Sequence, residues 1–288
     1  MSEKTLAEVD FTIIGLGLMG GSLAAALTGK VRSICAVDPN PAALQFALQR
    51  GWIDRGETRP SQPALDSDCV VLAAPVRANL AILAEISHLL PSGCLLLDLS
   101  STKAEIVSAM QNLPAHVQPL GGHPMCGKES QGIENADPQL FAGRVFFLTP
   151  LPRTSTDALL FTHQLVDAIQ ARPVVVDAAN HDRAVAAVSA LPYLLAGSLT
   201  RTVQHLAHEN PLVWQAAASG FRDTSRLAAS DTTMMLDALT TNPLNTLHAL
   251  RTCQADLQIL IDNLESGDTQ TLVQRLEQSK LTRRKYQE

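Results

Sequence analysis

Short apolar runs alternate with segments of helical periodicity along the first half of the chain. Near-continuous apolar runs at residues 11–14, 34–37, 69–73 and 94–98 are typical of parallel strands covered on both faces. Residues 20–27 and 41–50 show helical patterns, and Pro41 suits an early helical position. Runs at 145–148 and 174–176 predict later strands. This alternation predicts a doubly wound parallel α/β sheet with right-handed crossovers.

The pattern becomes helical throughout after residue 176. Apolar residues recur every three or four positions over 188–206 and 244–264. Asn-Pro pairs at 210–211 and 242–243 combine a capping residue with a proline suited to the first helical turn. Gly267 is expected to end the second period. We therefore expect two domains, residues 1–177 around the sheet and residues 178–288 all helical.

The predicted helices have wide apolar faces, and about a hundred residues offer little interior in which to bury them. We expect a homodimer formed through the helical half. The alternative is that the helices simply cover one another and the sheet.

Composition narrows the class of protein. The chain has 288 residues, 46% hydrophobic and 17% charged, with a formal net charge of −6, so it has no general attraction to nucleic acid or anionic membranes. Its five cysteines form no C-x-x-C pair, which argues against a zinc site or a disulfide framework and suits a reducing cytoplasm. The N-terminal ten residues are polar, and no apolar run has the length of a membrane span. We expect a soluble, cytoplasmic protein without a metal.

A glycine motif follows the first predicted strand and opens the first helix. Its glycines allow a tight turn, close approach to a pyrophosphate and close helix packing, while the helix N-terminus faces the negative charge. Asp38, at the end of the second strand, lies at the spacing expected for binding adenosine ribose hydroxyls. The alternative is that the glycines serve only a turn. The predicted cofactor-binding residues here are Gly15, Leu16, Gly17, Leu18, Met19, Gly20 and Asp38.

Asp38 also bears on cofactor choice. A carboxylate accepts hydrogen bonds from a free 2′-hydroxyl and repels a 2′-phosphate, so we expect NAD as the cofactor, with NADP possible. Ligands of open α/β sheets bind beyond the carboxyl ends of strands, so Pro75, Val76 and Ser100 are expected to border the cofactor. Ser101 follows, and it either hydrogen-bonds to substrate or to a catalytic histidine, or caps the helix that starts near Lys103.

His123 is the candidate catalytic residue. It lies in the stretch Gly-Gly-His-Pro-Met-Cys-Gly, residues 121–127, where glycines and a proline permit tight backbone. A histidine held beside a nicotinamide is a credible proton acceptor for hydride chemistry. Taken alone, His123 could equally cap a loop.

Two motifs together carry a family resemblance. Residues 121–127 and the stretch Gly-Phe-Arg-Asp-Thr-Ser-Arg at 220–226, with the glycine motif before them, resemble the prephenate/arogenate dehydrogenases of tyrosine biosynthesis. The chain is most similar to the short cyanobacterial-type arogenate dehydrogenases, including Arg-Lys-Tyr near the C-terminus. The resemblance implies a Rossmann-type dinucleotide-binding domain followed by a helical substrate and dimerisation domain.

The family resemblance also implies an activity and roles for individual residues. The family oxidatively decarboxylates prephenate or arogenate, transferring hydride from a ring carbon that bears a hydroxyl. His123 matches the general base, Ser101 the serine that supports it, and Arg226 the arginine that holds a substrate carboxylate. Taken alone, Arg226 would be a surface ion pair.

Other motif positions carry weaker expectations. His181-Asp182 matches a family pair at the entrance to the helical domain, where Asp182 either orients a hinge or caps its helix. Arg222 and Asp223 are expected to pair with each other, and Glu129 either faces a substrate ammonium or is simply exposed.

One segment departs from the family pattern. Many relatives read Ser-His-Leu-Pro at the start of the long helix, some with a further histidine, whereas this chain reads Ser189-Ala-Leu-Pro-Tyr193. Ser189 and Tyr193 are therefore the expected substrate-binding residues there. The loss of imidazoles slightly favours arogenate over prephenate, although Tyr193 can still donate a hydrogen bond.

Two other functions fit parts of the sequence. β-Hydroxyacid dehydrogenases share the glycine opening but use a lysine on the first long helix, and residues 181–206 contain none. A regulator that binds nucleotide without catalysis would need no histidine in such a stretch. We also expect no appended ACT-type module and no fused chorismate mutase, so that any inhibition by tyrosine would act at the active site.

Overall fold

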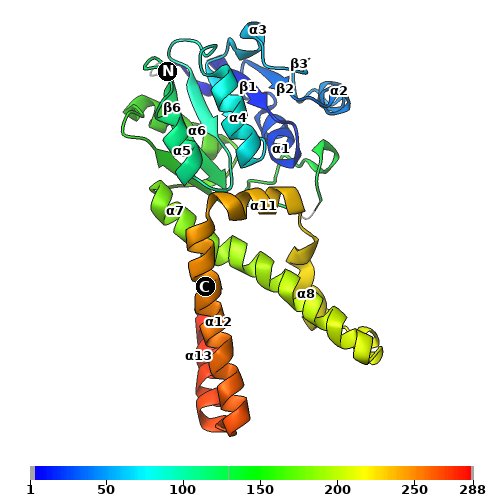
Figure 1. Cartoon of the computed structure of the whole chain (residues 1–288). Helices are drawn as coiled ribbons and strands as arrows, with labels where there is room; N and C mark the ends of the chain where they lie inside the picture. Colours follow the sequence, from blue (N-terminus) through cyan, green and yellow to red (C-terminus); the bar gives the residue numbers. More distant parts are fainter. Residues whose placement is uncertain (1–3, 129, 287–288) are drawn as a thin grey trace.

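An eight-stranded sheet forms the first half of the protein (Figure 1). The computed structural model describes residues 4–128 and 130–286. The strand order is β3-β2-β1-β4-β5-β6-β7-β8, so the chain reverses its direction of progress across the sheet between β1 and β4. The strands are β1 (Asp10–Ile14), β2 (Ser33–Val37), β3 (Arg55–Glu57), β4 (Cys69–Leu72), β5 (Leu95–Asp98), β6 (Gln118–Pro124), β7 (Val145–Pro150) and β8 (Arg172–Val175).

The expected doubly wound sheet is confirmed, with a departure at its far edge. The strands from β3 to β6 run parallel, whereas β7 is antiparallel to β6 and β8 runs parallel to β7. For β7 to run parallel to β6, the chain would need a crossover connection, usually a helix, back to the other end of the sheet. The described part of the link after β6 instead contains a short 3₁₀ helix, η2 (Ile133–Asn135). The chain therefore turns back at the same end of the sheet, and Pro124 pairs with Phe146.

Helices cover both faces of the sheet because successive strand residues point to opposite sides. In β5, Leu95 and Leu97 join one buried cluster and Leu96 joins the other. The first cluster includes residues of α1, α2 and α6, and the second includes residues of α3, α4 and α5. These helices are α1 (Leu18–Leu27), α2 (Pro41–Gln49), α3 (Gln62–Leu65), α4 (Val76–Ile86), α5 (Ala104–Met110) and α6 (Thr156–Ala168).

The second half is helical, as expected. It begins with α7 (Ala178–Val185), which packs against α5, and it returns to the sheet domain through α11 (Thr232–Thr241), which contacts α4. In Figure 1, α8 diverges from the antiparallel pair of α12 and α13, and both extend away from the sheet. Gly267, in the left-handed conformation at φ 68°, ends α12. The other helices are α8 (Leu191–Glu209), α9 (Leu212–Gln215), α10 (Ser219–Ser225), η4 (Arg226–Ala229), α12 (Pro243–Ser266) and α13 (Thr269–Lys285).

The residues from α7 to α8 form a continuous helix interrupted by a π-helical segment, η3 (Ala186–Ala190). Pro192 follows this segment. Proline cannot donate the hydrogen bond of a helix interior, and a π-turn accommodates the missing bond without ending the helix. The local change of helical pitch lies where Ser189 and Tyr193 were expected to bind substrate.

Candidate active site

The glycine turn between β1 and α1 has the close packing that its sequence predicts. Gly15 adopts φ +98°, and a Cβ at Gly20 would lie 1.8 Å from the carbonyl oxygen of Gly15. Gly17 is exposed, and a Cβ there would meet nothing within 4 Å. Two glycines therefore allow the turn to pack, while Gly17 leaves open space at the N-terminus of α1, where a phosphate group would approach.

Asp38 holds this turn in place. One carboxylate oxygen accepts a hydrogen bond from the backbone N–H of Leu16 at 2.7 Å, and the other accepts from the N–H of Asn40 at 2.8 Å. The side chain is half-buried at the end of β2. A carboxylate has further acceptor positions, so these two bonds leave it able to accept a ribose hydroxyl.

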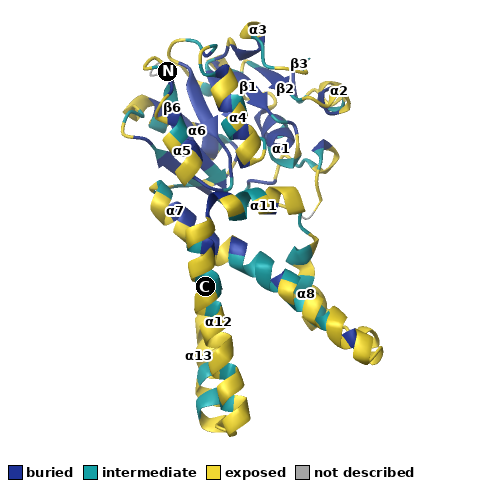
Figure 2. Ribbon diagram, viewed as in Figure 1, coloured by how far each residue is buried: buried dark blue, intermediate teal, exposed yellow. Residues whose placement is uncertain are grey.

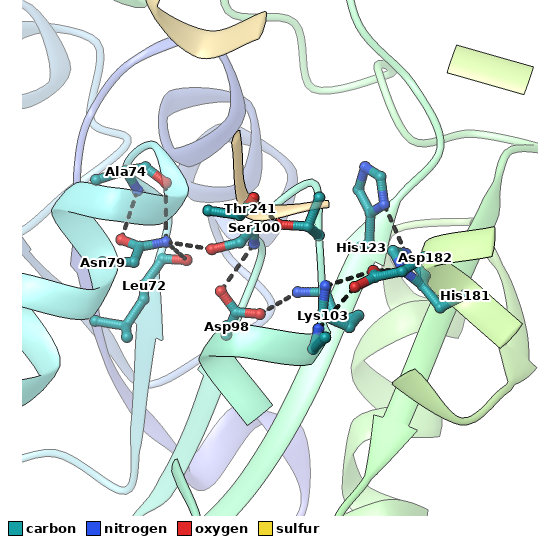
Figure 3. Close-up of polar contacts among 12 residues, drawn as sticks. Leu72, Ala74, Asn79, Asp98, Ser100, Lys103, His123, His181, Asp182 and Thr241 are labelled. Atoms are coloured by element: carbon teal, nitrogen blue, oxygen red, sulfur yellow. Dashed lines mark hydrogen bonds and ion pairs between the residues drawn. The ribbon is translucent and has the colours of Figure 1, made fainter. Parts of the chain in front are cut away.

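Asn79 joins the ends of β4 and β5, a role that no motif in the sequence indicates. Its amide oxygen accepts from the N–H of Ala74, and its amide nitrogen donates to the carbonyl of Ala74 and to the Ser100 hydroxyl at 3.0 Å (Figure 3). Pro75 and Val76 lie between Ala74 and Asn79, at the start of α4. The predicted residues Pro75, Val76 and Ser100 are therefore held by one buried amide.

Below Ser100 lies a fully buried ion pair between Lys103 and Asp98. The Asp98 carboxylate also accepts from the N–H of Ser100 at 2.9 Å. The desolvation of a buried ammonium lowers the pKa of Lys103, and the carboxylate of Asp98 acts in the opposite direction. The sequence analysis did not predict this pair, although an aspartate that ends a run of leucines, with a lysine five residues later, could have indicated it.

His123 lies on β6 and not in a loop, which corrects the expected backbone around it. Gly121 and Gly122 are buried strand residues, and a Cβ at Gly122 would lie 2.8 Å from the carbonyl oxygen of Asp98. These glycines therefore allow β6 to pack closely against β5 and its neighbours. Asp98 pairs with Gly121, so Ser100 and Ser101, which follow β5, leave the sheet at the same edge as His123 near the end of β6.

His123 is held by the helical half of the protein. Its Nδ1 lies 2.9 Å from Nε2 of His181, and Nδ1 of His181 lies 2.8 Å from Oδ1 of Asp182 (Figure 3). His181 and Asp182 are buried on α7. The opposite edge of the His123 ring points away from this contact in Figure 3. Three side chains from two parts of the chain thus form a hydrogen-bonded row that ends at the predicted base.

Asp182 caps a helix other than its own. The N-cap of α7 is Asp177, whereas the two oxygens of Asp182 accept from the N–H groups of Lys103 and Ala104 at 2.7 and 2.9 Å. Asp182 therefore caps α5, which corrects the expectation that it caps its own helix and also replaces Ser101 in that role. Asn242 completes the junction by donating to the carbonyl of Asp182 at 2.6 Å.

Burial keeps both imidazoles neutral. Desolvation lowers the pKa of His123 well below its ordinary value, and the nearby His181 and Lys103 lower it further. Desolvation also lowers the pKa of His181, although its bond to Asp182 opposes this effect. A neutral imidazole at position 123 is able to accept a proton at pH 7.

The predicted substrate-binding residues are spread over the helical half. Ser189 is exposed in the π-helical segment, and Tyr193 is half-buried in the first turn of α8. Arg226 is exposed at the start of η4, which packs against α8. Glu129 lies outside the described residues.

Known proteins resemble the chain in sequence and in fold. The family model for the prephenate dehydrogenase nucleotide-binding domain matches residues 23–175, and the model for the prephenate dehydrogenase dimerization domain matches residues 177–278. A prephenate dehydrogenase of Lactococcus lactis is 31% identical over 94% of this chain and 75% of its own length.

Solved structures agree with this match. A prephenate dehydrogenase from A. aeolicus, crystallised with hydroxyphenyl propionate and NAD+, superposes with a TM-score of 0.89 at 29% identity over 97% of this chain and 99% of its own. Synechocystis arogenate dehydrogenase has a TM-score of 0.82 at 26% identity over 96% of this chain and 99% of its own. The dinucleotide turn, the buried histidine row and these matches lead to one conclusion: the chain belongs to the prephenate dehydrogenase family.

Proposed function

We propose that the protein catalyses the oxidative decarboxylation of arogenate or prephenate in tyrosine biosynthesis, with NAD as the hydride acceptor. The observation that carries the proposal is the position of His123, which is hydrogen-bonded to His181 near the end of β6, at the same edge of the parallel strands as the dinucleotide turn after β1. The proposal is also supported by the similar proteins, which are named as a prephenate dehydrogenase and an arogenate dehydrogenase.

The residues around the turn fit the cofactor. Leu16, Leu18 and Met19 belong to the turn and the first residues of α1, while Gly17 leaves space for the pyrophosphate and Asp38 can accept from the ribose. When bound, NAD supplies an electrophilic ring carbon that accepts hydride. The Asp38 carboxylate disfavours a 2′-phosphate, so we propose a preference for NAD over NADP, and a specificity constant at least tenfold higher for NADP would contradict it.

His123 would act as the general base. It takes the proton of the ring hydroxyl as the hydride leaves the same carbon, and the electron pair of the bond to the departing CO2 enters the ring, which becomes aromatic. A positioned base contributes roughly 10²–10⁴-fold in rate. Ser101, which the family resemblance matches to the serine that assists the base, would support the hydroxyl, and Arg226 would hold a substrate carboxylate through paired N–H groups.

The direct test replaces His123 with asparagine. We expect the His123→Asn variant to bind NAD as the wild type does and to lose at least about a hundredfold in turnover, followed by the absorbance of NADH with each substrate. His88→Asn, at an exposed site after α4, is the matched control. Near-normal turnover in the His123 variant would remove it from the mechanism.

We propose arogenate as the slightly better substrate. Ala190 is buried in the segment where many relatives carry an imidazole, and Tyr193 follows one helical turn later. Fewer cationic partners disfavour the pyruvyl group of prephenate relative to the amino acid side chain of arogenate. Turnover measured side by side with both compounds decides the question, and a higher kcat/KM for prephenate would reverse the proposal.

We propose a homodimer formed through the helical half. Much of the surface of η3, α8, α12 and α13 is exposed in one copy (Figure 2), including Val188, Leu206, Leu244, Leu257, Leu264, Val273 and Leu276. The continuous helix from Ala178 to Glu209 is long and apolar enough to cross a membrane by length and composition alone, a criterion that core helices of soluble proteins also meet. A second copy explains the same apolar surface, since core and interface helices share this composition. Sedimentation without detergent should give a dimer.

We also propose that the domain boundary lies between residues 177 and 178, where Asp177 caps α7 after the last strand. A cytoplasmic location, expected from the scattered cysteines, stays a prediction that cell fractionation would test.

A further inference from the structure

We infer that His181 and Asp182 are positioning residues that fix the protonation pattern of His123, so that its Nε2 is the nitrogen without a proton. The inference rests on the proposed function, since it identifies which atom of the proposed base accepts the substrate proton. It is carried by the row of hydrogen bonds from Asp182 through His181 to His123.

The row of hydrogen bonds begins at Asp182, whose carboxylate accepts hydrogen bonds and does not donate them. Two backbone donors face the Asp182 carboxylate, since Oδ1 accepts from the N–H of Lys103 and Oδ2 from the N–H of Ala104, and Nδ1 of His181 also contacts Oδ1. An unprotonated Nδ1 would place its lone pair 2.8 Å from a carboxylate oxygen. His181 therefore carries its proton on Nδ1.

The remaining assignments follow from counting protons. A neutral imidazole has one N–H, so Nε2 of His181 is an acceptor. His123 lies 2.9 Å away and must supply the proton from its Nδ1. Because His123 is neutral as well, its Nε2 holds a free lone pair on the edge of the ring that points away from His181.

The same row stabilises the base after it has reacted. Proton uptake at Nε2 makes His123 an imidazolium, whose Nδ1–H still donates to His181. The positive charge then lies at the end of a row that leads to the carboxylate of Asp182. In the serine proteases, loss of the acid that sets the histidine tautomer lowers kcat by about 10⁴-fold.

The row also joins the two halves of the protein. His123 belongs to β6, whereas His181 and Asp182 belong to α7, and Asp182 is anchored to α5 by its two backbone contacts. The base is therefore correctly oriented only when α7 is docked on α5.

The test compares two replacements of His181. The amide oxygen of glutamine can accept from Nδ1 of His123, whereas leucine cannot. We expect His181→Gln to keep kcat within about tenfold of wild type and His181→Leu to lose at least about a hundredfold, with NAD affinity unchanged in both. His88→Leu is the exposed control. Wild-type kcat in His181→Leu, or an equal loss in a folded His181→Gln, would overturn the inference.

A spectroscopic measurement tests the inference without any variant activity. In protein labelled with 15N-histidine, proton–nitrogen correlation distinguishes protonated from unprotonated ring nitrogens. We expect His123 to carry its proton on Nδ1, with the His123→Asn variant assigning the signal. A proton on Nε2 of His123 in the folded wild type would contradict the inference. If the wild type turned over neither substrate while this pattern held, the proposed function alone would fail.

Discussion

Lys103 and Asp98 form an ion pair that is inaccessible to solvent, directly beneath the strand ends that carry Ser100 and His123. A buried ammonium is costly unless it is paired, so each partner depends on the other. The pair also lies between the buried amide of Asn79 and the Asp182 cap, and it thereby connects the cofactor side of the site to the base (Figure 3).

Breaking this pair should destabilise the protein strongly. In Lys103→Met the Asp98 carboxylate is left buried without a counter-charge, which costs about 3–5 kcal/mol of unfolding free energy. Urea unfolding measures the loss. The double variant Lys103→Met/Asp98→Leu should recover much of it, because apolar replacement of a buried pair is often close to neutral. A double variant as unstable as the single one would contradict this explanation.

The two functions of Asp182 should separate in two variants. In Asp182→Asn the amide oxygen can stay at the Oδ1 position, where it faces two donors, and its NH2 group then faces the N–H of Ala104. We expect a loss of about 1–2 kcal/mol in stability and less than about tenfold in kcat. Asp182→Ala removes both functions and should lower kcat much further. Equal kcat values in the two variants would show that the hydrogen-bond acceptor facing His181 is not needed for catalysis.

Acid should destabilise the folded state through the buried histidines. Below the ordinary histidine pKa of 6.5, His123 becomes protonated in the unfolded chain but stays neutral in the folded protein, because folding lowers the pKa of His123. The contribution to the free energy of unfolding is therefore complete above pH 6.5. It decreases as the pH is lowered, by up to about 1.4 kcal/mol per pH unit for each such histidine. The His123→Asn variant should show a shallower fall between pH 6.5 and 5. An identical slope would mean that His123 titrates normally when folded.

The glycines of the dinucleotide turn should respond differently to alanine. Gly20→Ala places a Cβ 1.8 Å from a backbone oxygen and should cost roughly 3 kcal/mol or more. Gly17→Ala has room in the free protein and should cost less than about 1 kcal/mol. We nevertheless expect Gly17→Ala to weaken NAD binding at least about tenfold, measured by calorimetry, because the new methyl group occupies the pyrophosphate approach. Unchanged NAD affinity would place the cofactor elsewhere.

Arg226 should affect substrate affinity more than chemistry. Replacing it with alanine removes the paired donors for a carboxylate, so KM for the cyclohexadienyl substrate should rise at least about tenfold while kcat changes less. Arg222→Ala, an exposed arginine of the same motif, is the control. An unchanged KM in Arg226→Ala would remove this residue from the binding site.

The sequence by itself determined the layers of the fold, because each depends on local periodicity. Apolar runs such as residues 94–98 specify buried strands, and the glycine spacing at 15–20 specifies the turn that receives a dinucleotide. A motif also marked His123 as the candidate base. The sequence did not identify the strand that carries His123, since glycines and proline disfavour strands, and the two glycines are explained only by close packing against β5, β7 and the start of α5.

Only the tertiary structure decided how the site is assembled. His181 and Asp182 are 58 and 59 residues from His123 along the chain, and no periodicity indicates that they form one row with it. The pairing of Lys103 with Asp98, the capping of α5 by Asp182 and the antiparallel return of β7 are likewise contacts between segments. Such contacts depend on how the two halves pack, and local sequence preference does not contain that information.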